Sequence, residues 1–322
     1  MQVLTQRQLR QFEEDGYLVV EDVLDPTRDI GPVLAEYDGV LDGIAASLVA
    51  QGAVASTYRE LPFPARLIRI CIESGRNFPQ EFDISLPQTG VLPETPIHVG
   101  PAVFGLLTTP RLLDLVEDVI GPEIYSNPVQ HIRMKLPKRA VAKGGHNGLI
   151  SQIPWHQDSG VILPEADQST ILTVWFPLND ATAENGCLQV IPGSHHSELI
   201  AHCPTEKGVA IPEPLLPATQ AVPLPMGPGS VLLMTQRTVH SSLDNVTQDQ
   251  VRLSFDLRYQ PIGQPTGRPA FPGFVARSAA LPDSVLRDPG VWARRWHDAR
   301  ARLAERENPA FNRWKAGVGV CA

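Results

Sequence analysis

The spacing of strand-forming residues constrains this fold more than any other feature. From residue 123 onward, short segments rich in β-branched and aromatic residues alternate with Gly and Pro turns. Many short strands at this spacing indicate a sandwich or barrel rather than a doubly wound sheet. No GxGxxG or GxxxxGK[ST] pattern occurs, so nucleotide-binding folds have no support. The predicted strands are 123–136, 151–156, 169–178, 187–191, 208–211, 220–224, 230–236 and 251–260.

The first third of the chain has a different texture and is expected to be rich in helix. Thr5 and Gln8 form a capping-box pattern, and Gly16 is placed to end the helix that they start. A strand is expected over 17–24. Further helices are predicted from Pro26 to about residue 51, near 64–75, and from Pro110 to Gly121.

Charge and composition exclude several classes of function. The net charge is −8, and no basic tract of the kind that follows phosphates is present, so we expect no nucleic-acid partner. The N-terminus has no apolar signal-peptide core and no segment is apolar enough to span a membrane. The cysteines are sparse and show no CxxC spacing, so we expect four reduced thiols in a cytoplasmic protein. They are Cys71, Cys187, Cys203 and Cys321.

A metal-binding pattern lies at the centre of the β-rich region. In an extended segment, residues i and i+2 point to the same face, so His156 and Asp158 can reach one metal ion together. His240, which follows the predicted strand 230–236, is the best third ligand. Two imidazoles and one carboxylate on one face of an octahedron leave three positions open, which is the arrangement of non-haem Fe(II) oxygenases.

A second pattern follows twelve residues after His240, where Arg252 and Ser254 share one face of a predicted strand. A planar guanidinium makes paired, charge-assisted bonds to a carboxylate, which suits the distal carboxylate of 2-oxoglutarate. The order HxD, distant His and RxS is far more specific than HxD alone, which is often only a structural hydrogen bond. An iron oxygenase that does not use 2-oxoglutarate has no need of this arginine.

These motifs resemble the phytanoyl-CoA dioxygenase family. The opening LTQRQLRQFEEDGYLVVEDVL is similar to the usual start of that family, and WHQD matches its iron motif. NGCLQVIPGSHH resembles the hairpin that follows the strand bearing Trp175. GSVLLMTQRTVHSSLDN and then VRLSFDLRY resemble the last core strands. The resemblance covers residues 3 to 262, and the segment 275–322 matches less well.

The resemblance implies a mainly β fold with flanking helices and a double-stranded β-helix (jelly-roll, cupin-like) core. We therefore expect one oxygenase domain over 1–322, with a helix-rich part at 1–122, the jelly-roll at 123–262 and a helical extension at 263–322. His156, Asp158 and His240 would bind Fe(II). Contacts to 2-oxoglutarate would come from Arg252, Ser254, Trp175, Gln130 and Ser242.

The implied reaction consumes O2 and 2-oxoglutarate, releases succinate and CO2, and removes a hydrogen atom from a C–H bond. Halogenating relatives replace the carboxylate ligand by a small residue, so Asp158 favours hydroxylation. Ascorbate is the expected reductant in vitro. The family acts on acyl-CoA thioesters, amino acids and terpenoid or alkaloid intermediates, and we favour a small secondary metabolite or carboxylic acid. The protein would be a monomer or homodimer.

Other features have both plain and functional interpretations. The alternative function is a non-catalytic or differently metallated cupin-like binding protein or isomerase. The basic stretch 133–143 could bind CoA phosphates or be a solvated loop. Loop 143–149 could be a lid or an ordinary loop, and the proline-rich segment 200–229 is expected to shape specificity. Trp155 could touch substrate or form part of the jelly-roll wall. His131, His146, His195, His196 and His202 are interpreted as surface or turn residues.

Overall fold

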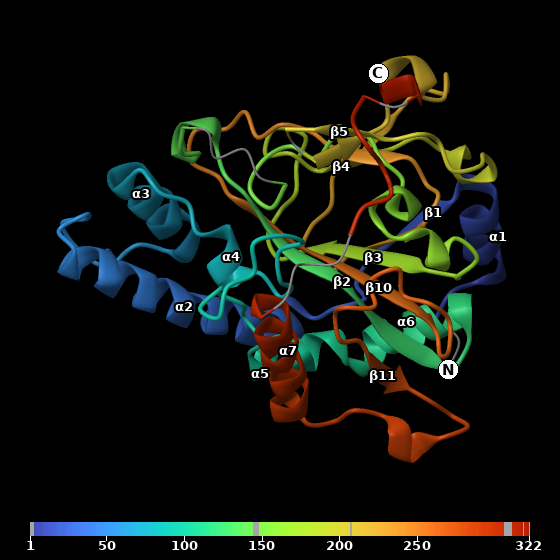
Figure 1. Cartoon of the computed structure of the whole chain (residues 1–322), viewed down its shortest axis with the longest axis horizontal. Coiled ribbons are helices and arrows are strands. Elements are labelled where there is room, and N and C mark those ends of the chain that lie inside the picture. The colour runs from blue at the N-terminus through green and yellow to red at the C-terminus, as the bar shows by residue number, and fades with distance from the viewer. Residues whose placement is uncertain (1–2, 144–147, 207, 306–310, 318, 322) are drawn as a thin grey trace.

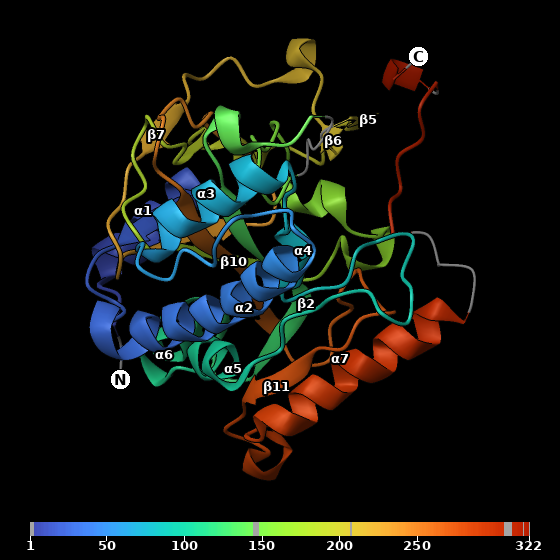
Figure 2. The same cartoon turned by 90° about the vertical axis from the view of Figure 1, so that its left-hand side faces the viewer.

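The computed structural model describes residues 3–143, 148–206, 208–305, 311–317 and 319–321. Two antiparallel sheets form the centre of the molecule, and helices from the first third of the chain cover one of their faces (Figure 1). Figure 2, turned by a quarter turn, shows α2 in front of the sheets, with α7 lower down, near α5 and β11. The expected class, antiparallel β-sheets with flanking helices, is confirmed.

The elements follow in chain order. The α-helices are α1 (Gln6–Asp15), α2 (Gly31–Ala50), α3 (Phe63–Ser74), α4 (Pro79–Phe82), α5 (Pro101–Leu107), α6 (Pro110–Ile120) and α7 (Pro289–Ala304). The strands are β1 (Tyr17–Val20), β2 (Ile124–Lys135), β3 (Leu172–Pro177), β4 (Leu188–Val190), β5 (Cys203–Thr205), β6 (Gly208–Ala210), β7 (Val222–Leu224), β8 (Val231–Thr235), β9 (His240–Ser242), β10 (Arg252–Pro261) and β11 (Phe274–Arg277).

The N-terminal helix signals act as predicted. The Thr5 hydroxyl accepts a hydrogen bond from the Gln8 amide, and the Gln8 side chain accepts one from the Thr5 amide. Gly16 ends α1 with a φ of 77°, the left-handed region that glycine enters at little cost. These caps fix the point where α1 stops and β1 starts, and β1 then pairs with β8 at the edge of the larger sheet.

Two facing sheets build the jelly-roll core. The larger has the strand order β1-β8-β3-β10-β2-β11, and the smaller has the order β7-β4-β9. An apolar cluster joins their inner faces, with Trp175 from β3 and Met234 from β8 meeting Leu188 from β4. A further short hairpin pairs β5 with β6. The β strands therefore enclose an interior, and side chains that alternate along each strand point either into it or out toward the helices.

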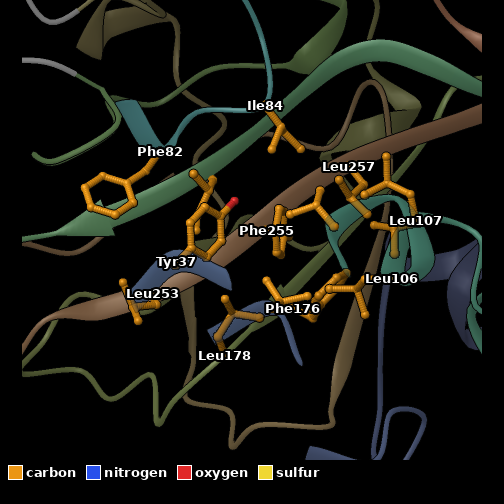
Figure 3. Packing of buried hydrophobic residues seen from close by; sticks show 14 of the residues in the cluster. Tyr37, Phe82, Ile84, Leu106, Leu107, Phe176, Leu178, Leu253, Phe255 and Leu257 are labelled. Atoms are coloured by element: carbon orange, nitrogen blue, oxygen red, sulfur yellow. The ribbon is translucent and has the colours of Figure 1, made fainter. Parts of the chain in front are cut away.

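Strand β10 shows this division most clearly. Leu253, Phe255 and Leu257 point out and pack against side chains of the helical layer such as Tyr37 of α2 (Figure 3). The Phe255 and Phe176 rings lie 5.7 Å apart, so β10 and β3 present one apolar surface to the helices. The residues between them on β10 are polar and still buried, which means that they face the interior. They are Arg252, Ser254, Asp256 and Arg258.

The strand predictions need two corrections. Residues 151–156 do not form a strand; only His156 makes an isolated bridge, with His240. Pro154 has no amide hydrogen to donate, which interrupts a ladder at this point. The strands β5, β9 and β11 were not predicted, because each has only three or four residues and no clear alternation.

The C-terminal part packs on the core through two tryptophans. Trp292 and Trp296 of α7 are fully buried, and Trp292 lies 5.7 Å from Phe104 of α5. The expectation of four reduced thiols is wrong, because Cys203 and Cys321 form a disulfide. Their separation of 118 residues carries no local spacing signal, and the fold alone brings the chain end to β5. No helix in the described ranges is long and apolar enough to cross a membrane.

Candidate active site

The three predicted metal ligands meet in the barrel interior. One ligand atom from each of His156, Asp158 and His240 lies within 4.8 Å of the others, and all three residues are buried. The Nε2 atoms of His156 and His240 lie 3.6 and 4.0 Å from Oδ1 of Asp158. The backbone bridge between the two histidines sets this geometry, since each amide donates to the other carbonyl at 3.0 Å. These atoms are close enough to share one ion.

Hydrogen bonds to the backbone orient both imidazoles. Nδ1 of His156 lies 2.9 Å from the Pro154 carbonyl, and Nδ1 of His240 lies 3.0 Å from the Thr238 carbonyl. A carbonyl can only accept, so each Nδ1 carries the proton and each Nε2 lone pair faces the cluster. Burial lowers the pKa of His240 to about 4, which keeps this ring neutral and able to bind a metal at neutral pH.

Asp158 belongs to a buried chain of alternating charges. Burial alone would raise its pKa, but the charge of Arg258 holds the pKa of Asp158 well below its usual range. Arg258 donates to Asp158 at 2.6 Å and lies 3.1 Å from Asp256, which in turn accepts from Arg133 at 2.5 Å. The Thr173 hydroxyl also donates to Asp158. Thr173 and Arg258 are register partners on β3 and β10, so the sheet itself delivers both donors.

The predicted cosubstrate residues around Arg252 also come together. Arg252 is fully buried, donates through Nε to the Gly186 carbonyl at 3.2 Å and through Nη1 to the Ser254 hydroxyl. Its guanidinium carbon lies 5.5 Å from the centre of the Trp175 ring. Nη2 of Arg252 and Nε1 of Trp175 have no hydrogen-bond partner among the described residues. Two buried donors without partners indicate room for an acceptor that the protein does not supply.

Lys135 adds a second basic group to this region, next to the predicted Ser242. Its amine donates to the Ser242 hydroxyl and to the Leu243 carbonyl. Burial, and then the charge of Arg252, lowers the pKa of Lys135 to about 6. Gly186 makes this close packing possible, since a Cβ there would lie 2.6 Å from the Leu243 carbonyl oxygen. Anionic oxygens of 2-oxoglutarate fit this donor set.

Gln130 is the one predicted site residue that the structure does not bring to this region. It lies on β2 two residues before Ile132, whose side chain packs in the helix-facing core. Its Oε1 has no partner among the described residues, and it lines neither of the two cavities beside the histidines. His131 and Arg133, on the opposite face of β2, line the larger cavity instead.

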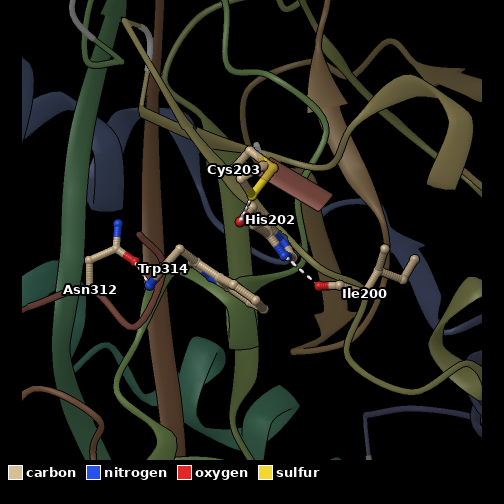
Figure 4. Close-up of a disulfide and its surroundings, with 6 residues drawn as sticks. Ile200, His202, Cys203, Asn312 and Trp314 are labelled. Carbon is tan, nitrogen blue, oxygen red and sulfur yellow. Dashed lines mark hydrogen bonds between the residues drawn. A yellow bond between two sulfur atoms is a disulfide. The ribbon is translucent and has the colours of Figure 1, made fainter. Parts of the chain in front are cut away.

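Sequence reasoning missed the outer partners of the metal ligands. The available signal was alternation, because Arg258 is six residues after Arg252 and must share its face of β10. His202, interpreted as a surface or turn residue, is fully buried and accepts a hydrogen bond from the Gln157 amide at 2.9 Å. Figure 4 shows His202 beside the disulfide, with the Trp314 ring stacked against it at 5.4 Å. Trp314, from the C-terminal segment, covers this ring on one side.

A cavity of about 390 Å³ opens beside the candidate metal ligands. His156, Arg258 and Arg268 line it, together with Pro204 and Val209 of the β5–β6 hairpin. The proline-rich segment thus contributes to the wall, while its expected effect on specificity stays a prediction. Trp155 packs with Ile191, Ile211 and Val239 instead, which matches the wall alternative for this residue. The proposed lid 143–149 lies largely outside the described residues, at 144–147.

The fold and the buried cluster define a class of protein: jelly-roll oxygenases with non-haem iron. Sequence comparison agrees, because the model of the phytanoyl-CoA dioxygenase family matches residues 12–254. The chain belongs to the phytanoyl-CoA dioxygenase family. It is therefore an enzyme of the 2-oxoglutarate-dependent, non-haem iron dioxygenase class, which includes hydroxylases.

Individual relatives support this placement. Phytanoyl-CoA dioxygenase domain-containing protein 1 of Rattus norvegicus is 27% identical over 266 residues, which cover 77% of this chain and 87% of the relative. L-proline trans-4-hydroxylase of Streptomyces griseoviridis is 26% identical over 196 residues, covering 55% of this chain and 69% of the relative.

Solved structures show the same fold. The apo form of the non-haem monooxygenase ThoJ matches with a TM-score of 0.56 at 18% identity, over 92% of this chain and 99% of that chain. EvdO2 of Micromonospora carbonacea var. aurantiaca, complexed with 2-oxoglutarate, matches with a TM-score of 0.51 at 22% identity, over 84% of this chain and 98% of that chain.

Proposed function

We propose that the protein hydroxylates a small organic substrate at an unactivated C–H bond, using Fe(II), O2 and 2-oxoglutarate. The observation that carries this proposal is the pairing of two buried features in one interior. The His156, Asp158 and His240 cluster offers three ligand atoms on one side. Arg252 lies on the same inner surface and has a donor that finds no partner in the described part of the chain.

In this proposal the three clustered residues hold the iron. Their Nδ1 hydrogen bonds to backbone carbonyls aim the histidine Nε2 atoms at the ion and fix the neutral tautomer. Arg258 and Thr173 fix the rotamer of Asp158, which needs no reorientation when the ion arrives. The bound iron supplies dioxygen activation and the oxidative decarboxylation of 2-oxoglutarate to succinate and CO2.

Arg252 and Ser254 anchor the distal carboxylate of 2-oxoglutarate, and Lys135 and Ser242 lie close enough to assist. A buried guanidinium without an acidic partner is costly, and a bound carboxylate removes that cost. Trp175 packs against the guanidinium and keeps it in place. Because Asp158 is present, the iron keeps its carboxylate ligand, which favours hydroxylation over halogenation.

The substrate enters the cavity beside His156. A volume of about 390 Å³ suits a small metabolite rather than a whole CoA ester. A CoA ester also needs free cations for its phosphates. In the basic stretch considered for that role, Arg133 is paired with Asp256, Lys135 is buried, and Lys138 is paired with Asp244. The relative that hydroxylates L-proline supports a small carboxylic acid as the substrate.

The test is turnover with defined components. The purified protein is supplied with Fe(II), 2-oxoglutarate, ascorbate and air, and is screened against small amino acids and alicyclic acids. We expect one product heavier by one oxygen atom, formed together with an equal amount of succinate. His156→Ala should abolish both products, while His196→Ala, an exposed histidine, should retain them. If an acid binds but none of the acids leads to succinate, the result would favour a cupin-like binding protein.

A further inference from the structure

The structure describes four buried arginines, and they fall into two kinds. Arg66 contacts Asp38 and Asp42, and Arg258 contacts Asp158 and Asp256. Arg252 and Arg268 are equally buried, at 0% and 2% exposure, but neither forms an ion pair with any described carboxylate. An isolated buried charge costs several kcal/mol unless something compensates it. For Arg252 the proposed function supplies the answer, which is 2-oxoglutarate.

The proposed function assigns no anionic partner to Arg268. Its Nη1 donates to the Phe311 carbonyl at 2.9 Å, and its Nη2 donates to the Val161 carbonyl at 2.5 Å. The guanidinium carbon also lies 5.3 Å from the centre of the Phe311 ring. These contacts orient the guanidinium and satisfy part of its hydrogen bonding, but they leave its charge uncompensated. Burial, and then the charge of Arg258, lowers the pKa of Arg268 to about 10, so it stays protonated at neutral pH.

The position of Arg268 relates it to the reacting centre. Arg268 lines the same cavity as His156 and Arg258. Val161, which it contacts, ends the short 3-10 turn that starts at Asp158. The cavity therefore has a candidate metal ligand on one part of its wall and an uncompensated cation on another. A substrate that fills it must contact both.

Gly267 fixes this arginine in place. Its φ is +69°, and a Cβ there would lie 2.7 Å from Cβ of Ile162, so only glycine lets the loop approach this closely. The Leu163 amide donates to the Gly267 carbonyl at 3.1 Å. The loop bearing Arg268 is thus attached to the segment that directly follows Asp158, which makes the site preorganised.

We infer that Arg268 binds a carboxylate of the substrate and thereby presents the substrate to the metal centre. This inference rests on the proposed function and names the substrate class of the same site. A carboxylate fits better than a phosphate, because one guanidinium compensates one negative charge. The other arginines that line the cavity, Arg133 and Arg258, are already engaged by carboxylates. The partner is therefore a small organic acid whose carboxylate binds at the cavity wall away from the iron.

Matched pairs of acids and amides test this inference. The probes are L-proline with L-prolinamide, cyclohexanecarboxylate with cyclohexanecarboxamide, and benzoate with benzamide. Each is titrated calorimetrically into protein saturated with 2-oxoglutarate, anaerobically, with Fe(II) and again without it. In the wild type, at least one acid should bind about tenfold or more tightly than its amide, the factor that a charge-assisted hydrogen bond adds.

Three variants decide whether Arg268 causes that preference. Arg268→Gln should bring the acid-to-amide ratio close to one, and Arg268→Lys should retain part of it. Arg295→Ala, an exposed arginine, should behave like the wild type. The inference is overturned if no acid binds more tightly than its amide, or if Arg268→Gln keeps the preference. The charge-transfer band of the Fe(II) and 2-oxoglutarate complex reports separately on the proposed function. If this band is absent while the acid preference persists, the proposed function is wrong but the anion-binding site at Arg268 stands.

Discussion

Two arginines on one strand face the same interior but differ in what surrounds them. Arg258 lies in a closed chain of opposite charges that joins Asp158 to Asp256 and Arg133. Arg252, six residues earlier on the same face of β10, donates hydrogen bonds to a carbonyl and a hydroxyl and pairs with no carboxylate among the described residues. Burial is complete in both cases, so solvent does not explain the difference.

The difference separates two tasks of a binding site. The paired end has its charges compensated within the protein, and under the proposed function it holds Asp158 ionised and in a fixed rotamer. The other end, with Arg252 and Lys135, has no carboxylate partner for Arg252 among the described residues, and under the same proposal it binds an anion. Under the proposed function, a cation-binding cluster and an anion-binding cluster lie in one interior, between the two sheets.

The largest effect is expected when Arg258 is removed from the paired end. Arg258→Met should lower the free energy of unfolding of the metal-free protein by about 3–5 kcal/mol, because Asp158 and Asp256 lose their shared partner inside the core. Fe(II) should restore part of this loss, because the ion takes over one of the two carboxylates. Chemical denaturation with and without Fe(II) measures both effects.

Arg258→Lys is the control for this variant, because it keeps the charge and loses only the planar geometry. It should fall between the wild type and Arg258→Met in stability. A loss below about 1 kcal/mol in Arg258→Met would contradict the account, since that is the range of a surface ion pair.

At the unpaired end, the pH dependence of cosubstrate binding sharpens the comparison. The pKa of Lys135 is about 6 in the free protein, so the amine is neutral at pH 8. A carboxylate beside it favours the charged form, and binding therefore takes up a proton. Affinity for 2-oxoglutarate should fall as the pH rises from about 6 to 9, by up to about tenfold per pH unit.

Calorimetry in buffers of different ionisation heat counts the proton taken up, and Lys135→Met should remove this dependence. The stability of the folded protein without cosubstrate depends on pH in the opposite direction. The unfolded chain binds a proton that the folded chain lacks, so this lysine makes the cosubstrate-free protein more stable as the pH rises through the same window. An affinity that does not change with pH in the wild type would contradict the placement of Lys135.

The smallest expected effect comes from Thr173, which donates to Asp158 beside Arg258. Thr173→Val keeps the shape and removes one donor while the ion pair remains. We expect an Fe(II) affinity lower by about tenfold, the lower part of the range for outer partners of metal ligands. Metal titration against a competing chelator measures it. An Fe(II) affinity unchanged in Thr173→Val would contradict this role of the hydroxyl.

Local patterns made much of the molecule predictable from the sequence. The capping box at Thr5 and the turn at Gly16 act through neighbours in the chain, so their geometry follows from residue type. The long strands β2, β3, β8 and β10 combine length with alternation and were recognised. The HxD motif, the distant histidine and RxS on β10 were each readable, although their roles stay a prediction.

The remaining features depend on contacts between distant segments. The Cys203–Cys321 disulfide and the burial of His202 under Trp314 require the C-terminal segment to cross to β5, which no local pattern signals. The expected role of Gln130 rested on the family resemblance alone, whereas alternation with Ile132 places its side chain on the helix-facing side of β2.

The central claim is that one interior binds Fe(II) at the histidine cluster and 2-oxoglutarate at Arg252. Anaerobic titration of the metal-free protein with both components, followed by the weak visible metal-to-ligand charge-transfer band, tests it most directly. The account predicts a band in the wild type, no band in His156→Ala, and in Arg252→Ala a band that needs about 10–100-fold more 2-oxoglutarate, the cost of a lost charge-assisted bond. No band in correctly folded wild-type protein would contradict it.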